Sequence, residues 1–316
     1  MQKVGNLVPS VKSEPLITRF IGDVGENSGN TVLFLGGIHG NEIAGIDALK
    51  SVFYQLNEIN PEFSGRAVAL VGNLRALKEN KRYLFRDMNR IWSRDVLDDM
   101  HYDRLDVSLP EYAELTELYA IIKALIDSTT GQFFVIDLHT TSSPTIPFIV
   151  TNKNDRCGEF TNSFPMPVIS GLTGFLDGTL LSYINELGHV GLAYEAGQHL
   201  NPKSALKHES FVWLTLSNTG ICPTLDEEFL EKHRLILQEE LVTRTNHFKL
   251  ISRYKIKDDE AFVMNPGYGN FQKIHEGEEL AYNQNGVITS PYDGFIFMPL
   301  YQPQGDDGFF IIKPDA

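Results

Sequence analysis

Two histidines and a glutamate that follow apolar runs are the residues best suited to hold a metal ion. His39 and Glu42 lie in GGIHGNE, directly after the apolar run TVLFL, and a spacing of three residues puts two side chains on one face of a helix. His139 follows a second apolar run, FFVIDL. Imidazole nitrogen and carboxylate oxygen are both zinc ligands, and a catalytic zinc site needs only three protein ligands. These residues therefore predict one Zn²⁺ ion per chain.

Two further segments carry groups that a hydrolytic zinc site would use. Glu195 follows the short apolar run GLAY, and a carboxylate beside a metal can act as a general base. The segment KRYLFRDMNR contains Arg82, Arg86 and Arg90. Because arginine binds carboxylates through paired N–H groups and can stabilise an oxyanion, this segment predicts an anion-binding site.

The elements that must position these residues follow from the hydrophobic pattern. Apolar runs predict buried strands of a mainly parallel sheet at 31–37, 67–72, 133–138 and 191–194. Helical patterns lie between and after them, at 42–56, at 110–127 with Ser108 as a cap, at 179–187, and at 226–247 with Thr224 as a cap. Strands that alternate with helices predict a three-layer α/β domain, whose ligands bind at the carboxyl ends of the strands.

The hydrophobic pattern of the sequence changes near residue 260. Short alternating segments are broken there by the turn sequences NPGYGN, NQNG, SPYDG and QPQGDDG, which predict a small all-β domain. We therefore expect a zinc hydrolase α/β domain over 1–255 and a β-rich C-terminal domain over 256–316. Tyr301, Phe309 and Phe310 are the aromatic residues of this domain that could reach the pocket.

Composition excludes several classes of partner. Asp and Glu outnumber Lys and Arg by 41 to 27, and the net charge of −14 argues against nucleic acid or an anionic membrane as a partner. The two cysteines, Cys157 and Cys222, are too far apart for a C-x-x-C zinc motif. No signal peptide and no apolar run of about 18 residues is evident, so we expect a cytoplasmic protein. The composition is compatible with a homo-oligomer and does not determine the oligomeric state.

Taken in order, the segments GGIHGNE, RYLFRDMNR, DLHTT and YEAGQ resemble the succinylglutamate desuccinylase/aspartoacylase family, relatives of the zinc carboxypeptidases. The C-terminal segment PYDGFIFMPLYQPQGDDGFF also looks like the β-domain of that family. The resemblance implies a zinc-carboxypeptidase-like fold, with His39, Glu42 and His139 as zinc ligands and Glu195 as the general base. It implies further roles for residues of the second segment: Arg82 stabilises the oxyanion, Asn89 and Arg90 hold the α-carboxylate of the substrate, and Asp87 orients His39.

The predicted function is zinc-dependent hydrolysis of the linear amide bond of a small anionic N-acyl amino acid. Aspartoacylases resemble one another in an additional arginine some ten residues before the catalytic glutamate, and 183–194 contains no arginine, which argues against N-acetylaspartate. One alternative is a zinc carboxypeptidase that acts on short peptides. The other is a non-catalytic zinc or binding protein. The segment HEGEELAYNQNGV resembles the turn pattern of domains that carry biotin or lipoate, but it lacks the exposed lysine that such a domain needs. Serine hydrolysis through Ser142 or Ser143 is not supported, because no G-x-S-x-G motif surrounds these residues.

Overall fold

The computed structural model describes residues 18–152, 155–239 and 247–315. Its strands form one sheet in the order β1-β3-β2-β4-β7-β5-β6-β8-β14-β13-β10 and a small sheet in the order β12-β11-β9. The strands are β1 Phe20–Gly25, β2 Asn30–Gly36, β3 Gly65–Val71, β4 Phe133–Thr141, β5 Phe148–Thr151, β6 Val168–Ser170, β7 Val190–Gln198, β8 His247–Lys255, β9 Val263–Met264, β10 Gln272–Ile274, β11 Glu279–Asn283, β12 Gly286–Thr289, β13 Gly294–Phe297 and β14 Asp307–Pro314.

The four strands predicted from apolar runs lie side by side in the large sheet. β3, β2, β4 and β7 are parallel neighbours, and nearly all of their residues are buried, as the continuous apolar runs require. β1 pairs with β3 in the antiparallel direction, and β5 does so with β7. The sheet is therefore mixed around a parallel core.

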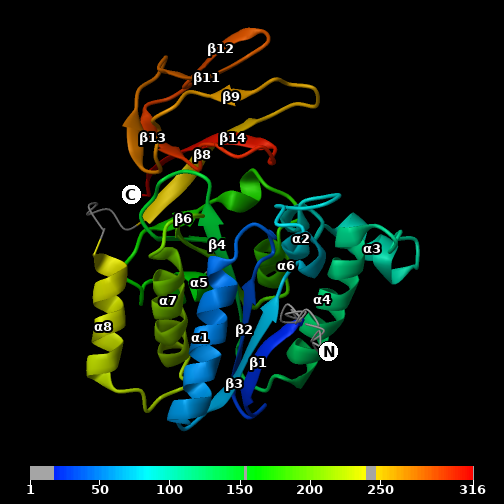
Figure 1. Ribbon diagram of the computed structural model, residues 1–316, viewed down its shortest axis with the longest axis vertical. Coiled ribbons are helices and arrows are strands. Elements are labelled where there is room, and N and C mark those ends of the chain that lie inside the picture. The colour runs from blue at the N-terminus through cyan, green and yellow to red at the C-terminus, as the bar shows by residue number, and fades with distance from the viewer. Residues whose placement is uncertain (1–17, 153–154, 240–246, 316) are drawn as a thin grey trace, which may run out of the picture.

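Helices cover both faces of this sheet, so the fold is α/β, as predicted (Figure 1). α1, α7 and α8 contribute to one apolar core together with Val32 and Phe34 of β2, whereas α4 and α6 pack with Leu33 and Leu35 on the other face. The helices are α1 Ala44–Ile59, α2 Leu74–Lys78, α3 Arg94–His101, α4 Pro110–Ser128, α5 Asp155–Thr161, α6 Leu180–Glu186, α7 Ser204–Asn218 and α8 Glu227–Gln238, with 3-10 turns η1 Met88–Arg90 and η2 Leu172–Gly174. Among the described residues, no helix is both long enough and apolar enough to cross a membrane.

The C-terminal region is β-rich, and it continues the large sheet. β8 pairs with β6 in the parallel direction and with β14 in the antiparallel direction, so hydrogen bonds run from the α/β part into β14, β13 and β10. The small sheet of β9, β11 and β12 lies at the far end of the molecule from α1 and α8 (Figure 1). The boundary at residue 255 coincides with the end of β8, and a separate domain from there onward stays a prediction.

The structure corrects the predicted helix over 226–247. α8 ends at Gln238, and His247 is the first residue of β8. The cap is Asp226, whose carboxylate accepts the backbone N–H of Phe229, and not Thr224. Residues 240–246 of the prediction lie outside the described residues.

One further helix prediction was wrong, and one long helix was missed. Ser108 does not cap α4: the cap position is Leu109, and the Ser108 hydroxyl donates to Asp106. α7 was not predicted at all. Most of α7 is buried, from Ser204 to Leu216, so it lacks the polar stripe that makes a surface helix recognisable in a sequence.

Candidate metal centre and active-site pocket

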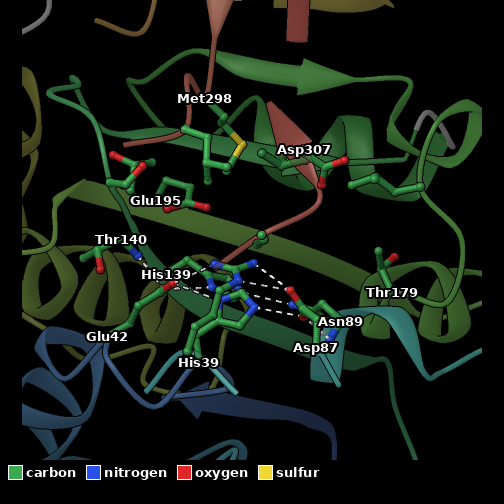
Figure 2. A pocket seen from close by; sticks show the side chains of 18 of the residues that line it. His39, Glu42, Asp87, Asn89, His139, Thr140, Thr179, Glu195, Met298 and Asp307 are labelled. Carbon is green, nitrogen blue, oxygen red and sulfur yellow. Dashed lines mark hydrogen bonds and ion pairs between the residues drawn. The ribbon is translucent and has the colours of Figure 1, made fainter. Parts of the chain in front are cut away.

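His39, Glu42 and His139 converge on one point, although they come from different segments. One donor atom of each side chain lies within 4.8 Å of the others, and all three residues are buried. Nδ1 of His39 is 2.8 Å from Glu42 Oε1, and Nδ1 of His139 is 3.0 Å from Glu42 Oε2 (Figure 2). The carboxylate thus lies between two imidazole nitrogens, and the three groups could hold one metal ion.

The turn that follows β2 brings His39 and Glu42 to this point. Gly37 has φ +70°, a conformation that favours glycine, and a Cβ on Gly40 would lie 2.2 Å from the backbone carbon of Ala76. The N–H of Glu42 donates to the carbonyl of His39, and α1 begins only at Ala44. The two residues therefore share a tight turn and not a helical face, which corrects the local geometry expected from their spacing.

The second ring nitrogen of each histidine, Nε2, contacts an aspartate. Asp87 Oδ1 is 3.1 Å from Nε2 of His39, and Asp137 Oδ2 is 2.7 Å from Nε2 of His139. When Nε2 donates to a carboxylate, Nδ1 is free to bind a metal. Asp87 was predicted to orient His39, but Asp137 was missed. It lies two residues before His139 on the same strand, a spacing that puts both side chains on one face and could have identified it.

The charges of these groups depend on one another. Burial alone would raise the pKa of Glu42, but His39 and His139 outweigh it and hold that pKa well below its usual range. Burial alone would lower the pKa of His139, but Asp137 and Glu42 raise it well above its usual range. A cation bound at Nδ1 would replace the proton of His139, so the donor set fits a metal ion electrostatically as well as geometrically.

Glu195 lies beside His139, on the neighbouring strand β7. The two residues are register partners in the sheet, and both line the pocket (Figure 2). Glu195 Oε2 is buried and has no hydrogen-bond partner among the described residues. Burial raises the pKa of this carboxyl group to about 8. A carboxyl group without a fixed partner, next to the metal donors, is available for proton transfer.

Of the three arginines of the second motif, Arg82 and Arg90 line the pocket, whereas Arg86 is exposed and lies outside it. Arg82 donates from Nε and Nη2 to Asp87 Oδ2, and its Nη1 is 3.6 Å from Glu42 Oε1. The same carboxylate of Asp87 thus contacts both Arg82 and His39. Burial opposes ionisation of Asp87, but Arg82 and His39 hold its pKa well below its usual range.

Arg90 and Asn89 already have protein partners. Arg90 Nη2 donates to Asp307 Oδ2 of β14 at 2.5 Å. Asn89 donates from Nδ2 to Asp137 Oδ2 at 3.0 Å and accepts the backbone N–H of Leu180. The predicted carboxylate-binding pair is therefore connected both to the metal donors and to the C-terminal region.

Glu111 of α4 holds the loop that carries Arg82 and Asp87. It is fully buried, and its carboxylate accepts the backbone N–H groups of Leu84 at 2.7 Å and Phe85 at 2.8 Å. These contacts fix the loop between its two functional side chains. The sequence analysis missed Glu111, because nothing in a helical pattern distinguishes this glutamate from a solvated one.

The loop after β13 covers the pocket from the C-terminal side. Gln304 donates to the carbonyl of Tyr83, and Gln302 lies within hydrogen-bond distance of Asn41 and His199. The residues of this region that line the pocket are Met298, Leu300, Gln302, Gly305, Asp306, Asp307 and Phe310. Of the three aromatic candidates, Phe310 is therefore the one at the pocket. Phe309 stacks on Tyr254, and the hydroxyl of Tyr301 donates to the backbone of Asn265.

Known proteins are similar to this chain in sequence or in fold. A Xenopus laevis protein named N-acyl-aromatic-L-amino acid amidohydrolase (carboxylate-forming) is 24% identical over 278 residues, which cover 81% of this chain and 87% of that protein. The crystal structure of a succinylglutamate desuccinylase/aspartoacylase from Rhodobacter sphaeroides has a TM-score of 0.66 at 17% identity and covers 93% of this chain and 88% of that one. Murine aminoacylase 3 has a TM-score of 0.59 at 19% identity, with coverage of 92% and 96%.

The catalytic-domain profile of one family matches the chain directly. That profile, described as the succinylglutamate desuccinylase/aspartoacylase catalytic domain, covers residues 28–214 and so includes all four motifs. The match extends over more than half of the 316 residues. The resemblance is thereby confirmed, and the chain is an enzyme of the succinylglutamate desuccinylase/aspartoacylase family.

Proposed function

We propose that this enzyme uses one zinc ion to hydrolyse the amide bond of an N-acyl amino acid. The observation that carries the proposal is the convergence of the donors His39, Glu42 and His139 with Glu195 in one pocket, where Oε2 of Glu195 has no hydrogen-bond partner in the described part of the chain. The name of the Xenopus relative, an amidohydrolase of N-acyl amino acids, supports the same reaction.

Zinc suits the donor set better than calcium or magnesium. Two imidazoles and one carboxylate are typical ligands of catalytic zinc, whereas calcium and magnesium prefer oxygen ligands alone. When bound, zinc would polarise the amide carbonyl and increase the acidity of the attacking water. Asp87 and Asp137 would keep both histidines in the tautomer that presents Nδ1.

Glu195 would move the proton in this reaction. As a carboxylate it accepts a proton from the attacking water, and as a carboxylic acid it then donates that proton to the nitrogen of the leaving amine. A nearby cation favours the carboxylate form, so metal binding would lower the pKa from the value of about 8 that burial causes. Arg82 would stabilise the oxyanion with Nη1, because its Nε and Nη2 are held by Asp87.

Arg90 and Asn89 would hold the α-carboxylate of the substrate. Arginine has five N–H donors, and only some of those of Arg90 are used by Asp307 and by the carbonyl of Asn89. The amide of Asn89 has a second N–H besides the one given to Asp137. Both groups could therefore bind a carboxylate without losing their present partners.

A zinc carboxypeptidase acting on peptides is the second candidate, but the loop after β13 argues against it. Gln302 and Gln304 of that loop form hydrogen bonds with Asn41 and Tyr83, which belong to the α/β part of the chain. An extended peptide would have to displace these contacts, whereas a small N-acyl amino acid would not.

Metal analysis combined with a substrate screen tests the proposal. The purified enzyme should contain one zinc per chain and release amine from at least one N-acetyl or N-succinyl amino acid. A chelator should abolish the activity, and added zinc should restore it. Turnover of dipeptides but of no acyl-amino acid would favour the carboxypeptidase. A zinc-loaded enzyme without activity on either class would refute the proposal.

A further inference from the structure

The pocket has an apolar wall that the proposed chemistry does not use. Its residues come from five separate elements or their flanks: Val150 of β5, Leu172 of η2, Leu176 after it, Leu181 of α6, Ala193 of β7 and Phe310 of β14. Each of them is 2–8% exposed. All six belong to one apolar core cluster. The wall is therefore the part of this cluster that faces the pocket.

The wall begins directly beside Glu195. In the pairing of β5 with β7, Val150 is the partner of Ala193, and Ala193 lies two residues from Glu195. Residues two apart on a strand point to the same face of the sheet. Met298 lines the same pocket near Glu195 (Figure 2). A substituent attached close to the scissile amide would therefore contact apolar side chains.

Positive charge in the pocket is confined to the polar side. Arg82 and Arg90 are the only lysine or arginine residues that line it within the described part of the chain, and each is already paired with an aspartate. Asp306 and Asp307 lie on the side of the C-terminal loop, where Asp307 is paired with both Arg90 and Arg253. A second carboxylate on the substrate would meet apolar side chains or these aspartates, and burying an unpaired carboxylate is strongly unfavourable.

We infer that the substrate carries one carboxylate and an uncharged, apolar substituent that lies against this wall. The substituent is either an apolar amino-acid side chain or an apolar acyl chain. The inference rests on the proposed deacylation and defines its substrate class: dianionic compounds such as N-acetylaspartate are excluded by charge, and small compounds such as N-acetylglycine leave the wall unused.

A series of four substrates tests the inference and separates the two sources of the apolar group. N-acetylglycine is the reference, N-acetylleucine extends the side chain, N-hexanoylglycine extends the acyl chain, and N-acetylaspartate adds a carboxylate. Each methylene that reaches the wall should raise kcat/KM about threefold to fourfold. The kcat/KM of N-acetylaspartate should be lower than that of N-acetylleucine by on the order of 100-fold. If neither extended substrate exceeds N-acetylglycine, or if N-acetylaspartate equals N-acetylleucine, the inference is wrong.

Two matched leucine variants show whether the wall itself causes the preference. Leu176 lines the pocket, whereas Leu250 of β8 belongs to the same core cluster, is 2% exposed and does not line the pocket. Leu176→Ala should lower the ratio of kcat/KM for the better extended substrate over N-acetylglycine by about threefold to tenfold. Leu250→Ala should destabilise the protein and leave that ratio unchanged, since a loss of folded enzyme affects both substrates equally. Equal ratios in the two variants would overturn the assignment of the wall.

Binding measurements keep this inference separable from the proposed reaction. With zinc-loaded Glu195→Gln, calorimetry should still show tighter binding of the better extended compound than of N-acetylglycine or N-acetylaspartate. If no acyl-amino acid is hydrolysed but this order of affinity holds, the proposed reaction fails and the apolar subsite stands. If hydrolysis occurs and the order is reversed, the reaction stands and the subsite fails.

Discussion

The two sides of the pocket are built in different ways. The polar side is a network in which Asp87, Asp137 and Glu111 each contact a neighbouring functional group or its loop. These three residues lie in the loop before η1, on β4 and on α4. The apolar side is assembled from residues of β5, η2, α6, β7 and β14, which are separated from one another in the sequence. We therefore expect the reaction to depend mainly on residues of the sequence motifs, and the choice of substrate to depend on how distant segments pack.

The largest effect should come from the metal donors. His139→Ala removes one of the three candidate donors and one of the two hydrogen-bond partners of Asp137 Oδ2. Zinc affinity should fall by more than the roughly 10- to 100-fold that is typical for loss of an outer partner, and turnover should vanish. Elemental analysis of the purified protein measures this. The exposed His101 of α3 provides the control, and stoichiometric zinc in His139→Ala would exclude His139 as a ligand.

Glu195→Gln should separate proton transfer from metal binding. The amide cannot accept the proton of the attacking water, so kcat should fall about 100- to 10,000-fold while zinc content stays unchanged. Steady-state kinetics with parallel metal analysis measures both quantities. Glu186→Gln, an exposed glutamate of α6, should behave like the unmodified enzyme. Unaltered kcat in Glu195→Gln would remove it as the base.

The outer carboxylates should have an intermediate effect. Asp137→Asn weakens the hydrogen bond to Nε2 of His139, and zinc affinity should fall about 10- to 100-fold. Competition with a chromophoric chelator measures the affinity. Asp87→Asn should cause a similar loss through His39 and should also lower kcat, because Asp87 holds Arg82. If both variants keep full affinity, the aspartates do not support the metal donors.

Glu111→Gln should affect the folded state more than the metal. The buried carboxylate accepts two backbone N–H groups at under 3 Å, so its replacement should lower the free energy of unfolding by about 1–3 kcal/mol. Urea unfolding measures this. Glu117→Gln on the same helix is the matched control, because that residue is half exposed and its pair with Arg19 should contribute under about 1 kcal/mol. Equal losses in the two variants would contradict a special role for Glu111.

The smallest effect is expected at the junction of the two sides. Asp307→Asn removes the charge that is paired with both Arg90 and Arg253, so Arg90 should bind the substrate carboxylate more strongly and KM should fall by less than about tenfold. Zinc content and kcat should not change. A rise in KM would mean that Asp307 positions Arg90 and does not compete with the substrate.

Much of the α/β core could be predicted from the sequence, because strands buried on both faces are continuous apolar runs. The four predicted strands are neighbours in the sheet, with bounds that differ from the predictions by a few residues. The failures have physical causes. α7 is buried on most sides and shows no helical stripe, and the pattern over 226–247 continued through the start of β8, whose side chains alternate in burial.

The sequence by itself indicated the candidate metal donors and Glu195, because these residues lie at a glycine turn or near a strand end within their motifs. Tertiary structure alone decided how they are supported and what faces them. Arg90 meets Asp307 across a separation of 217 residues, and the apolar wall combines segments from Val150 to Phe310. Contacts over such separations depend on sheet order and on the packing of the C-terminal strands, which no local pattern of residues encodes.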